Sequence, residues 1–363
     1  MALAASASAL SLAACGVMDG VDAGSTPVTP KKGNDITVGL LLPEKENTRY
    51  EKFDYPIIKK KVTALTHGQG KVVYANAGAD ADEQSKQLDQ MIDDQVDVLL
   101  VDAVDAEAIA PGIKKAKDAG IPVIAYDRLA QGPIDAYISF DNQLVGQVQG
   151  RSLAEALGAK APYSKIIMMN GSVTDPNAAQ FKEGALSELK GKVNIVKTYD
   201  TRDWKPEVAK ANMAEAIRAV GLNNIAAVYS ANDGIAGAVI DALKEAGVSK
   251  VPPVTGQDAE LAAVQRIVAG DQYMSVYKSY PQEATSAAEM AVAKVQGRSI
   301  EFDALTRDKV DSPTQKQIPA MLVPVVALTK ENIEDTVLQD EIYTVKDICT
   351  AKYKSDCQAI GLK

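Results

Sequence analysis

From residue 36 onward, short apolar runs of strand length alternate with amphipathic helical patterns. Several of the runs are continuously apolar rather than alternating, as expected for strands that are buried on both faces of a parallel sheet. The runs lie at 36–42, 72–75, 96–101, 123–126, 137–140, 166–169, 193–196, 226–229 and 274–277. This rhythm of strand and helix predicts a parallel α/β architecture.

Four of the intervening segments have helical patterns. The segment 82–94 begins with acidic residues and places Leu88 and Met91 on one face. Three others stop at a glycine, which commonly ends a helix because it adopts the left-handed conformation without strain. These are 106–119 before Gly120, 206–220 before Gly221 and 233–246 before Gly247.

The length of the chain and the repetition of the rhythm predict two Rossmann-like lobes. With 363 residues, about two domains are expected. Crossings between the lobes are expected near Asp141-Asn142, near Lys278 and within 318–324, and several crossings would form a hinge. The expected parts are a signal or lipobox remnant at 1–15, a flexible linker at 16–34, an N-terminal lobe at 35–141 plus 279–320, a C-terminal lobe at 142–278 plus 321–345, and a tail at 346–363 with a cysteine pair.

The composition argues against several classes of function. The net charge is −9 and the pI is about 4.9, whereas binding to nucleic acid phosphates needs clustered Lys and Arg. The single histidine, His67, lies in a His-Gly-Gln-Gly turn, so a His-rich metal site is excluded. The sequence contains no HExxH, P-loop or Gly-x-Ser-x-Gly pattern. We expect no nucleic acid partner, no metal, no cofactor and no catalytic residues.

The N-terminal segment indicates a bacterial lipoprotein. The stretch Leu12-Ala13-Ala14-Cys15-Gly16 resembles a lipobox, in which the cysteine is lipidated and becomes the mature N-terminus. Residues 1–14 are small and apolar, like the end of a signal peptide. No Lys or Arg precedes Cys15, so we interpret the start as truncated. The alternative to a lipobox is a chance match in an Ala-rich segment. The polar residues 16–34 are typical of a disordered linker.

Two further cysteines, Cys349 and Cys357, lie in the polar C-terminal tail. In an oxidising compartment they would form a short-loop disulfide, whereas in the cytosol they would be free thiols, and the sequence leaves both open. No segment after Cys15 reaches the roughly 18 consecutive apolar residues that a membrane-spanning helix needs.

Polar and aromatic residues recur just past the ends of the predicted strands, where ligands bind in alternating β/α proteins. The set combines planar hydrogen-bonding groups with one indole and has no pair of nucleophile and base. Because a sugar offers hydroxyls that donate and accept and C–H faces that are apolar, this set suits holding a sugar without reacting with it. Its members are Arg49, Asp127, Arg128, Asn142, Asn177, Trp204, Asn232, Asp258 and Lys278.

Each residue also has a simpler interpretation. Asp127 and Arg128 could form a surface turn, and the positions around Asn142, Asn232 and Asp258 could be helix caps. Trp204 is the only tryptophan and lies in a polar loop, which favours a stacking role over a core role. Such residues recur at the ends of the predicted strands, and this recurrence favours a binding site.

Seven motifs in order resemble bacterial sugar-binding proteins of ABC import systems, in the pentose/hexose group of the type I periplasmic-binding fold. They are Ala125-Tyr126-Asp127-Arg128, Tyr137-Ile138-Ser139-Phe140-Asp141-Asn142, Gly171-Ser172 through Asp175 and Asn177, Asp203-Trp204, Asn232-Asp233, Gly256-Gln257-Asp258-Ala259 and Val276-Tyr277-Lys278. The stretch 322–337 fits as well. The resemblance covers roughly residues 35–340, and residues 349–363 have no counterpart in it.

The resemblance implies a set of ligand contacts. The family's sugar contacts fall on Arg49, Asp127, Arg128, Asn177, Trp204, Asn232, Asp258 and Lys278, with Asn142 at the first hinge. Tyr50 stands where the family has a tryptophan, and it either stacks on the sugar or forms the wall of the cleft. Since buried charges are tolerable only when paired, we expect Asp127 and Arg128 to neutralise each other or Asp258.

The resemblance also implies a function. The chain would be a monomeric, extracytoplasmic receptor that is anchored by a lipid on Cys15 to the outer face of the bacterial cell membrane. It would close on a monosaccharide, D-xylose by preference, and deliver it to an ABC permease. Glucose, arabinose and ribose are the alternative ligands. Galactose and glucose binders of this fold often carry a calcium loop, and the absence of such a loop from the sequence favours the xylose-like interpretation.

The sequence also bears on three rival functions. A transcriptional regulator of this fold would need a DNA-binding module before residue 35, where a lipobox-like segment and a linker stand instead. An enzyme would need a catalytic dyad or a phosphate loop, but Leu42 is followed by Pro43-Glu44-Lys45 rather than by a glycine-rich turn. A sensor lipoprotein that serves a signalling partner is not distinguished from a transport receptor by sequence.

Overall fold

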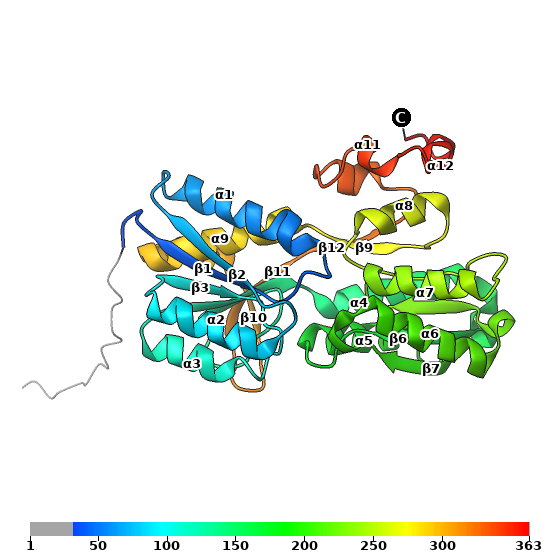
Figure 1. Ribbon diagram of the computed structural model, residues 1–363, viewed down its shortest axis with the longest axis horizontal. Coiled ribbons are helices and arrows are strands. Elements are labelled where there is room, and N and C mark those ends of the chain that lie inside the picture. Colours follow the sequence, from blue (N-terminus) through cyan, green and yellow to red (C-terminus); the bar gives the residue numbers. More distant parts are fainter. Residues whose placement is uncertain (1–31, 363) are drawn as a thin grey trace, which may run out of the picture. The chain divides into compact units, whose positions relative to one another are not determined.

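The computed structural model describes residues 32–362. The lipidation candidate Cys15 lies outside these residues, as do residues 16–31 of the expected linker. Two groups of strands organise the part that is described, each flanked by helices (Figure 1). The parallel α/β architecture predicted from the sequence is confirmed, and every predicted strand is present.

The N-terminal lobe is built on a seven-stranded sheet with the order β10-β11-β5-β4-β3-β1-β2. All neighbours in this sheet are parallel except β10, which runs antiparallel to β11. Its strands are β1 (Thr37–Leu42), β2 (Lys71–Asn76), β3 (Val98–Val101), β4 (Val123–Tyr126), β5 (Ala136–Phe140), β10 (Asp308–Val310) and β11 (Ile318–Val323). Its helices are η1 (Tyr50–Asp54), α1 (Tyr55–Leu65), α2 (Ala81–Asp93), α3 (Ala110–Asp118), α9 (Tyr280–Gln296) and α10 (Ser299–Leu305).

Helices cover both faces of the seven-stranded sheet, with α1 and α9 on one face and α2 and α3 on the other (Figure 1). Leu40 and Leu100 pack in the core on the α9 side, whereas Leu41 and Leu99 pack in the core on the α2 side. Because alternate residues of β1 and β3 point into two different cores, these strands are apolar along their whole length.

The C-terminal lobe has a three-stranded parallel sheet, β7-β6-β8, and an antiparallel pair, β12-β9. Isolated bridges from Val228 to Val254 and from Gln257 to Val276 connect the two. Its strands are β6 (Lys165–Asn170), β7 (Asn194–Asp200), β8 (Ala227–Ser230), β9 (Ser275–Lys278) and β12 (Val325–Leu328). Its helices are α4 (Asn142–Leu157), η2 (Gly158–Tyr163), α5 (Pro176–Leu189), η3 (Arg202–Trp204), α6 (Pro206–Val220), η4 (Leu222–Asn224), α7 (Asp233–Glu245), α8 (Leu261–Ala269), η5 (Glu334–Leu338), α11 (Val345–Ile348) and α12 (Lys354–Ala359).

Helices α4 and α5 approach each other closely because glycines face the contact. A methyl group on Gly146 would lie 2.0 Å from the Phe181 carbonyl oxygen, and one on Gly184 would lie 2.0 Å from the Gln143 carbonyl oxygen. Any larger side chain would therefore separate the helices. The contact lies in the middle of α5, whose first turn carries Asn177.

The chain passes between the lobes after β5, after β9 and after β11. The first passage is at Asp141, which caps α4, and the second is at Ser279, before α9. The predicted third boundary, after residue 320, falls inside β11, because that strand pairs with β5 up to Val323. Pro324 stands between β11 and β12, and it ends the pairing because proline has no backbone N–H to donate.

Both ends of the described part differ from the expected boundaries. Lys32, placed in the linker by sequence, forms a 2.6 Å ion pair with Asp97, so the folded body begins before residue 35. The expected tail is not separate either, because α11 and α12 pack against α8. Ile348 and Cys357 are buried in one cluster with Ile267 of α8.

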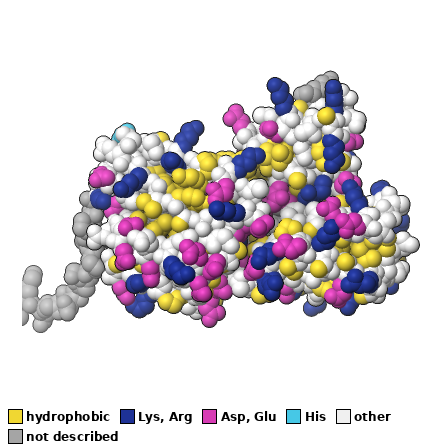
Figure 2. Space-filling model, viewed as in Figure 1, with side chains coloured by type: hydrophobic (Ala, Val, Ile, Leu, Met, Phe, Trp, Pro, Cys, Tyr) yellow, Lys and Arg dark blue, Asp and Glu magenta, His cyan; other side chains and the backbone are white. Residues whose placement is uncertain are grey.

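The sulfur atoms of Cys349 and Cys357 are bonded in the structure, at 2.04 Å. Among residues 32–362, none of the helices has both the length and the apolar character required to cross a lipid bilayer. On the face shown in Figure 2, Lys and Arg side chains are interspersed with Asp and Glu side chains rather than gathered in one area.

Candidate functional site

A cleft between the lobes collects the predicted ligand residues. All of the predicted ligand residues except Asn142 line it, and Tyr50 lines it as well. Asn142 is buried at the hinge instead, where its amide nitrogen lies 3.5 Å from the Ser139 hydroxyl. The lining residues are Glu44, Glu46, Asn47, Arg49, Tyr50, Asp127, Arg128, Asp175, Asn177, Phe181, Trp204, Pro206, Asn232, Gly234, Gln257, Asp258, Glu260 and Lys278.

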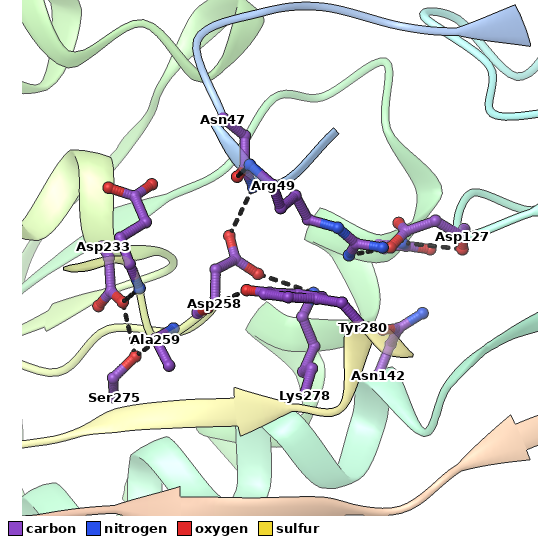
Figure 3. Close-up of polar contacts among 12 residues, drawn as sticks. Asn47, Arg49, Asp127, Asn142, Asp233, Asp258, Ala259, Ser275, Lys278 and Tyr280 are labelled. Carbon is purple, nitrogen blue, oxygen red and sulfur yellow. Dashed lines mark hydrogen bonds and ion pairs between the residues drawn. The ribbon is translucent and has the colours of Figure 1, made fainter. Parts of the chain in front are cut away.

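Arg49 is held by three carboxylates in the N-terminal lobe. Its guanidinium nitrogens lie 2.7 Å from Asp127, 2.8 Å from Asp54 and 2.5 Å from Glu283, and the side chain is 2% exposed. Figure 3 shows the guanidinium directed at Asp127. Burial raises the pKa of Glu283 well above its usual range, although Arg49 opposes that effect. The network fixes both Arg49 and the Asp127 carboxylate in place.

Arg128 is held by acidic groups from both lobes. Its Nε lies 2.9 Å from Asp175 of the C-terminal lobe and 3.5 Å from Asp102 at the end of β3. One of its terminal nitrogens donates to the Ala103 carbonyl at 3.0 Å. The expected direct pairing of Asp127 and Arg128 with each other or with Asp258 is not found in residues 32–362, although the charge of Arg128 still helps to lower the pKa of Asp127. These side chains diverge, and each pairs with a different partner.

Asp258 joins the two lobes at the other end of the cleft. Its carboxylate lies 2.8 Å from the Lys278 ammonium and accepts a 2.9 Å hydrogen bond from the Asn47 amide (Figure 3). The Tyr280 hydroxyl donates to the Asp258 carbonyl oxygen. Asp258 is not the cap of the helix that follows, because the residue at the N-cap of α8 is Glu260.

Several cleft residues have strained backbones. Asp127, Trp204 and Asp258 have φ angles of 57°, 58° and 92°, in the left-handed region that side-chain-bearing residues rarely occupy. Such conformations cost about 1–3 kcal/mol each and cluster at functional sites. Here they turn the side chains that follow the strands into the cleft.

The indole of Trp204 is positioned by contacts on two sides. Its Nε1 donates to Asp175 at 3.1 Å, and its ring meets Phe181 edge to face with centroids 6.3 Å apart. Gly171 lies so close that a methyl group there would be 2.0 Å from the indole Cη2 atom. The ring is thereby held as a rigid wall of the cleft.

The two asparagines combine local and cleft roles. Asn177 donates to the Asp127 carboxylate across the cleft at 2.9 Å. Asn232 caps α7, because its side-chain oxygen accepts from the Ile235 amide at 2.9 Å. Asn232 is therefore a helix cap, as the simpler interpretation of the sequence expected, and it also lines the cleft.

The charges of the cleft favour an ionised acceptor at Asp127. Burial opposes its ionisation, but Arg49, Lys278 and Arg128 outweigh burial and lower the pKa of Asp127 below its usual value. Burial lowers the pKa of Lys278 less than Asp258 and Asp127 raise it, so the ammonium stays charged. The site therefore presents fixed cationic donors and a fixed carboxylate acceptor beside an indole face.

Other site residues were missed from sequence. Asp175 precedes a proline and caps α5, a pattern that signals a helix start but not a partner for Arg128. Asn47 lies in a loop without a motif. Asp54 and Glu283 occur at helical positions with ordinary surface composition, and no sequence pattern indicates that they surround Arg49.

Comparison with known proteins places these features in context. The family model described as periplasmic binding protein domain matches residues 38–299. The D-xylose-binding periplasmic protein of Haemophilus influenzae is 35% identical, with the match covering 86% of this chain and 92% of that protein. The multiple sugar-binding periplasmic receptor of Rhizobium radiobacter is 32% identical, with coverage of 85% and 90%.

A solved structure shares the fold of this chain. An ABC transporter solute-binding protein from Clostridium phytofermentans, with bound β-D-glucose, is 27% identical and superposes with a TM-score of 0.79. That match covers 86% of this chain and 99% of the other.

Proposed function

The chain belongs to the periplasmic binding protein family, and we propose that it captures a monosaccharide, D-xylose before other aldoses, between its two lobes. It has the type I periplasmic-binding fold and is a binding protein rather than an enzyme, as its relatives are. Proteins of this family act outside the cytoplasm and serve ABC transporters.

The observation that carries the proposal is that polar groups from both lobes meet in one cleft. Asp127 and Asn177, from different lobes, are 2.9 Å apart, and Asn47 and Asp258 are also 2.9 Å apart. A polyol seated between these groups would receive hydrogen bonds from both lobes and would favour the closed form. The fixed partners of Arg49 reduce the entropy lost when the ligand is bound.

Each group has a role that follows from its chemistry. Arg49, Arg128 and Lys278 donate to sugar oxygens, while Asp127 and Asp258 accept from sugar hydroxyls. Asn177 and Asn232 can do both, because an amide carries a donor and an acceptor. Trp204 covers an apolar face of the ring, and Tyr50 forms the wall beside it.

The descriptions of two similar proteins favour D-xylose as the ligand, but they do not exclude other aldoses. Two relatives, from Haemophilus influenzae and Escherichia coli, are described as D-xylose-binding, at 35% and 34% identity. The Clostridium phytofermentans structure holds β-D-glucose, which differs from D-xylose by one hydroxymethyl group. Glucose, arabinose and ribose therefore remain the alternative ligands of the same site.

The proposal extends to the partners. The ligand would be passed to an ABC permease, with a signalling receptor as the alternative partner, and the chain would act as a monomer.

A lipid on Cys15 would anchor the chain to the outer face of the cell membrane, which the lipobox-like sequence supports. Mass spectrometry of the membrane-extracted protein tests the anchor. An N-terminal diacylglyceryl-cysteine is expected, and Cys15→Ala should release the protein from the membrane.

A thermal-shift panel tests the ligand. The Cys15→Ala chain is heated with D-xylose, D-glucose, L-arabinose, D-ribose or D-galactose. A sugar at about 100 times its Kd stabilises the folded state by about 2.7 kcal/mol, which raises the unfolding temperature by several degrees. We expect the largest rise with D-xylose. No rise with any sugar would contradict the proposed function, and a larger rise with another aldose would correct the ligand.

A further inference from the structure

We propose that Asp102 is the counterion that holds Arg128 when the lobes separate, and that it thereby weakens the closed, sugar-binding form. The inference rests on the proposed function, since it concerns how that site opens and closes. It assigns a positioning role to Asp102, a residue that does not line the cleft.

Asp102 is a buried carboxylate with too few partners. It follows β3 and is 0% exposed. Within residues 32–362, no protein group donates a hydrogen bond to either of its carboxylate oxygens. Within the described part of the chain, its one ion-pair contact is the Arg128 Nε, at 3.5 Å. A buried carboxylate is costly unless it is paired and hydrogen-bonded, so this arrangement leaves Asp102 poorly compensated.

The Nε of Arg128 lies closer to the carboxylate of the opposite lobe than to Asp102, although it makes no hydrogen bond to any group of residues 32–362. Its Nε lies 2.9 Å from Asp175, which caps α5 in the C-terminal lobe. A second nitrogen is bound to the Ala103 carbonyl, one residue after Asp102, so the guanidinium stays with the N-terminal lobe. When the lobes separate, Asp175 must move away with α5, whereas Asp102 remains within reach of Arg128.

The charges around Asp102 favour an exchange in which Arg128 leaves Asp175 and pairs with Asp102. Burial raises the pKa of the Asp102 carboxyl well above its usual range, Arg128 and Arg49 oppose this effect, and Asp127 and Asp175 add to it. Burial raises the pKa of the Tyr50 hydroxyl well above its usual range, and the charge of Asp102 adds to this effect. Departure of Asp175 removes one repelling carboxylate and frees Arg128, and both changes favour Asp102 in its charged form.

Asp102 therefore competes with Asp175 for Arg128, and the competition sets the fraction of molecules that are closed. The apparent Kd of a ligand that binds the closed form equals the intrinsic Kd divided by that fraction. Removing the Asp102 charge should raise the closed fraction and tighten sugar binding. The gain cannot exceed the reciprocal of the closed fraction, and we expect about threefold to tenfold.

The test compares Asp102→Asn and Asp102→Leu with Asp175→Asn in the full chain carrying Cys15→Ala. Affinities and dissociation rates are measured with the sugar that the thermal-shift panel identifies. Both Asp102 variants should bind more tightly with slower dissociation, and Asp175→Asn should bind more weakly. Asp135→Asn is the matched control, because Asp135 is an N-terminal-lobe carboxylate paired with Lys117 and Lys294 and does not line the cleft. It should leave the affinity unchanged.

A second readout follows opening without sugar. Trp204 is the only tryptophan and is 9% exposed in the cleft, so acrylamide quenching of its emission reports the open fraction. Both Asp102 variants should be quenched less than the parent, which a merely structural loss would not produce. Unchanged or weaker affinity, or increased quenching, in folded Asp102 variants would overturn the role of Asp102. Failure of the parent chain to bind any sugar would instead overturn the proposed function.

Discussion

The side-chain amide of Asn47 donates a 2.9 Å hydrogen bond to the carboxylate of Asp258, although 211 residues separate them in the chain. Asn47 belongs to the loop after β1, and Asp258 precedes α8 in the other lobe. The same carboxylate lies 2.8 Å from the Lys278 ammonium. The contact therefore joins the two lobes at a group that is also proposed to bind the sugar.

Asn47→Ala should weaken sugar binding about fivefold to tenfold, because a typical hydrogen bond contributes about 0.5–1.5 kcal/mol and this one is only partly buried. The folded state should be little affected, since the loop keeps its other contacts. Calorimetry of the variant measures the change. Asn223→Ala is the control, because Asn223 is exposed on η4 in the C-terminal lobe. Equal affinities of Asn47→Ala and the parent would exclude a role of this contact in closure.

Arg49→Met should destabilise the protein by about 3–5 kcal/mol at pH 7, because it leaves the carboxylates of Asp54, Asp127 and Glu283 buried without their cation. The loss should be smaller at pH 5 than at pH 7, because burial raises the pKa of Glu283 and loss of Arg49 removes a charge that opposes this effect, so Glu283 gains a proton more readily as pH falls. Urea unfolding at both pH values measures the difference. Lys210→Met, which removes an exposed ion pair with Glu245, should show no measurable loss. A loss that is independent of pH would contradict this view of Glu283.

Gly171→Ala should displace the indole of Trp204, because the new methyl group would lie 2.0 Å from its Cη2 atom. A rigid ring cannot yield locally, so we expect a shift of the tryptophan emission and at least about a tenfold loss of sugar affinity. Gly33→Ala is the control, since no atom of residues 32–362 lies within 4 Å of its added methyl group. An unchanged emission spectrum in Gly171→Ala would show that the ring is not held at this place.

Stability should fall as pH rises from about 4 to about 7. Burial raises the pKa of Asp233 from 3.8 to about 7, with Arg266 opposing. The folded state thus binds a proton that the unfolded state has lost, so the contribution of this group is complete below pH 4 and is lost as pH passes 7. The expected change is up to about 4 kcal/mol.

Urea unfolding between pH 4 and 8 measures this dependence. Asp233→Asn should flatten the curve, whereas Asp303→Asn, an exposed carboxylate on α10, should leave it as in the parent. Identical pH slopes for the parent and Asp233→Asn would refute the assignment to Asp233.

Much of the framework follows from local sequence. The runs that became β1, β3 and β4 are continuously apolar because helices cover both faces of their sheet, and that pattern is visible without a structure. Helix α6 has its predicted bounds, since Pro206 starts it and Gly221 follows its end. The carboxyl ends of parallel strands meet at one edge, so polar residues there could be expected to converge.

The pairing of charges could not be predicted in this way. Asp127 and Arg128 are adjacent, but the positive φ of Asp127 turns its carboxylate toward Arg49 while Arg128 reaches Asp175. Glu283 lies 234 residues from Arg49, and only the packing of α9 on the sheet brings them together. Contacts between lobes depend on tertiary geometry, on which a local pattern carries no information.

The most direct test of the central claim is isothermal titration calorimetry of the Cys15→Ala chain with D-xylose and D-glucose, beside Asp258→Ala and Trp204→Ala. We expect one-to-one binding with tighter affinity for D-xylose, and a loss of at least about tenfold in each variant while the protein stays folded. Binding that both variants retain would place the ligand outside this cleft. Absence of heat with either sugar, and with the other aldoses, would contradict the claim that the cleft holds a monosaccharide.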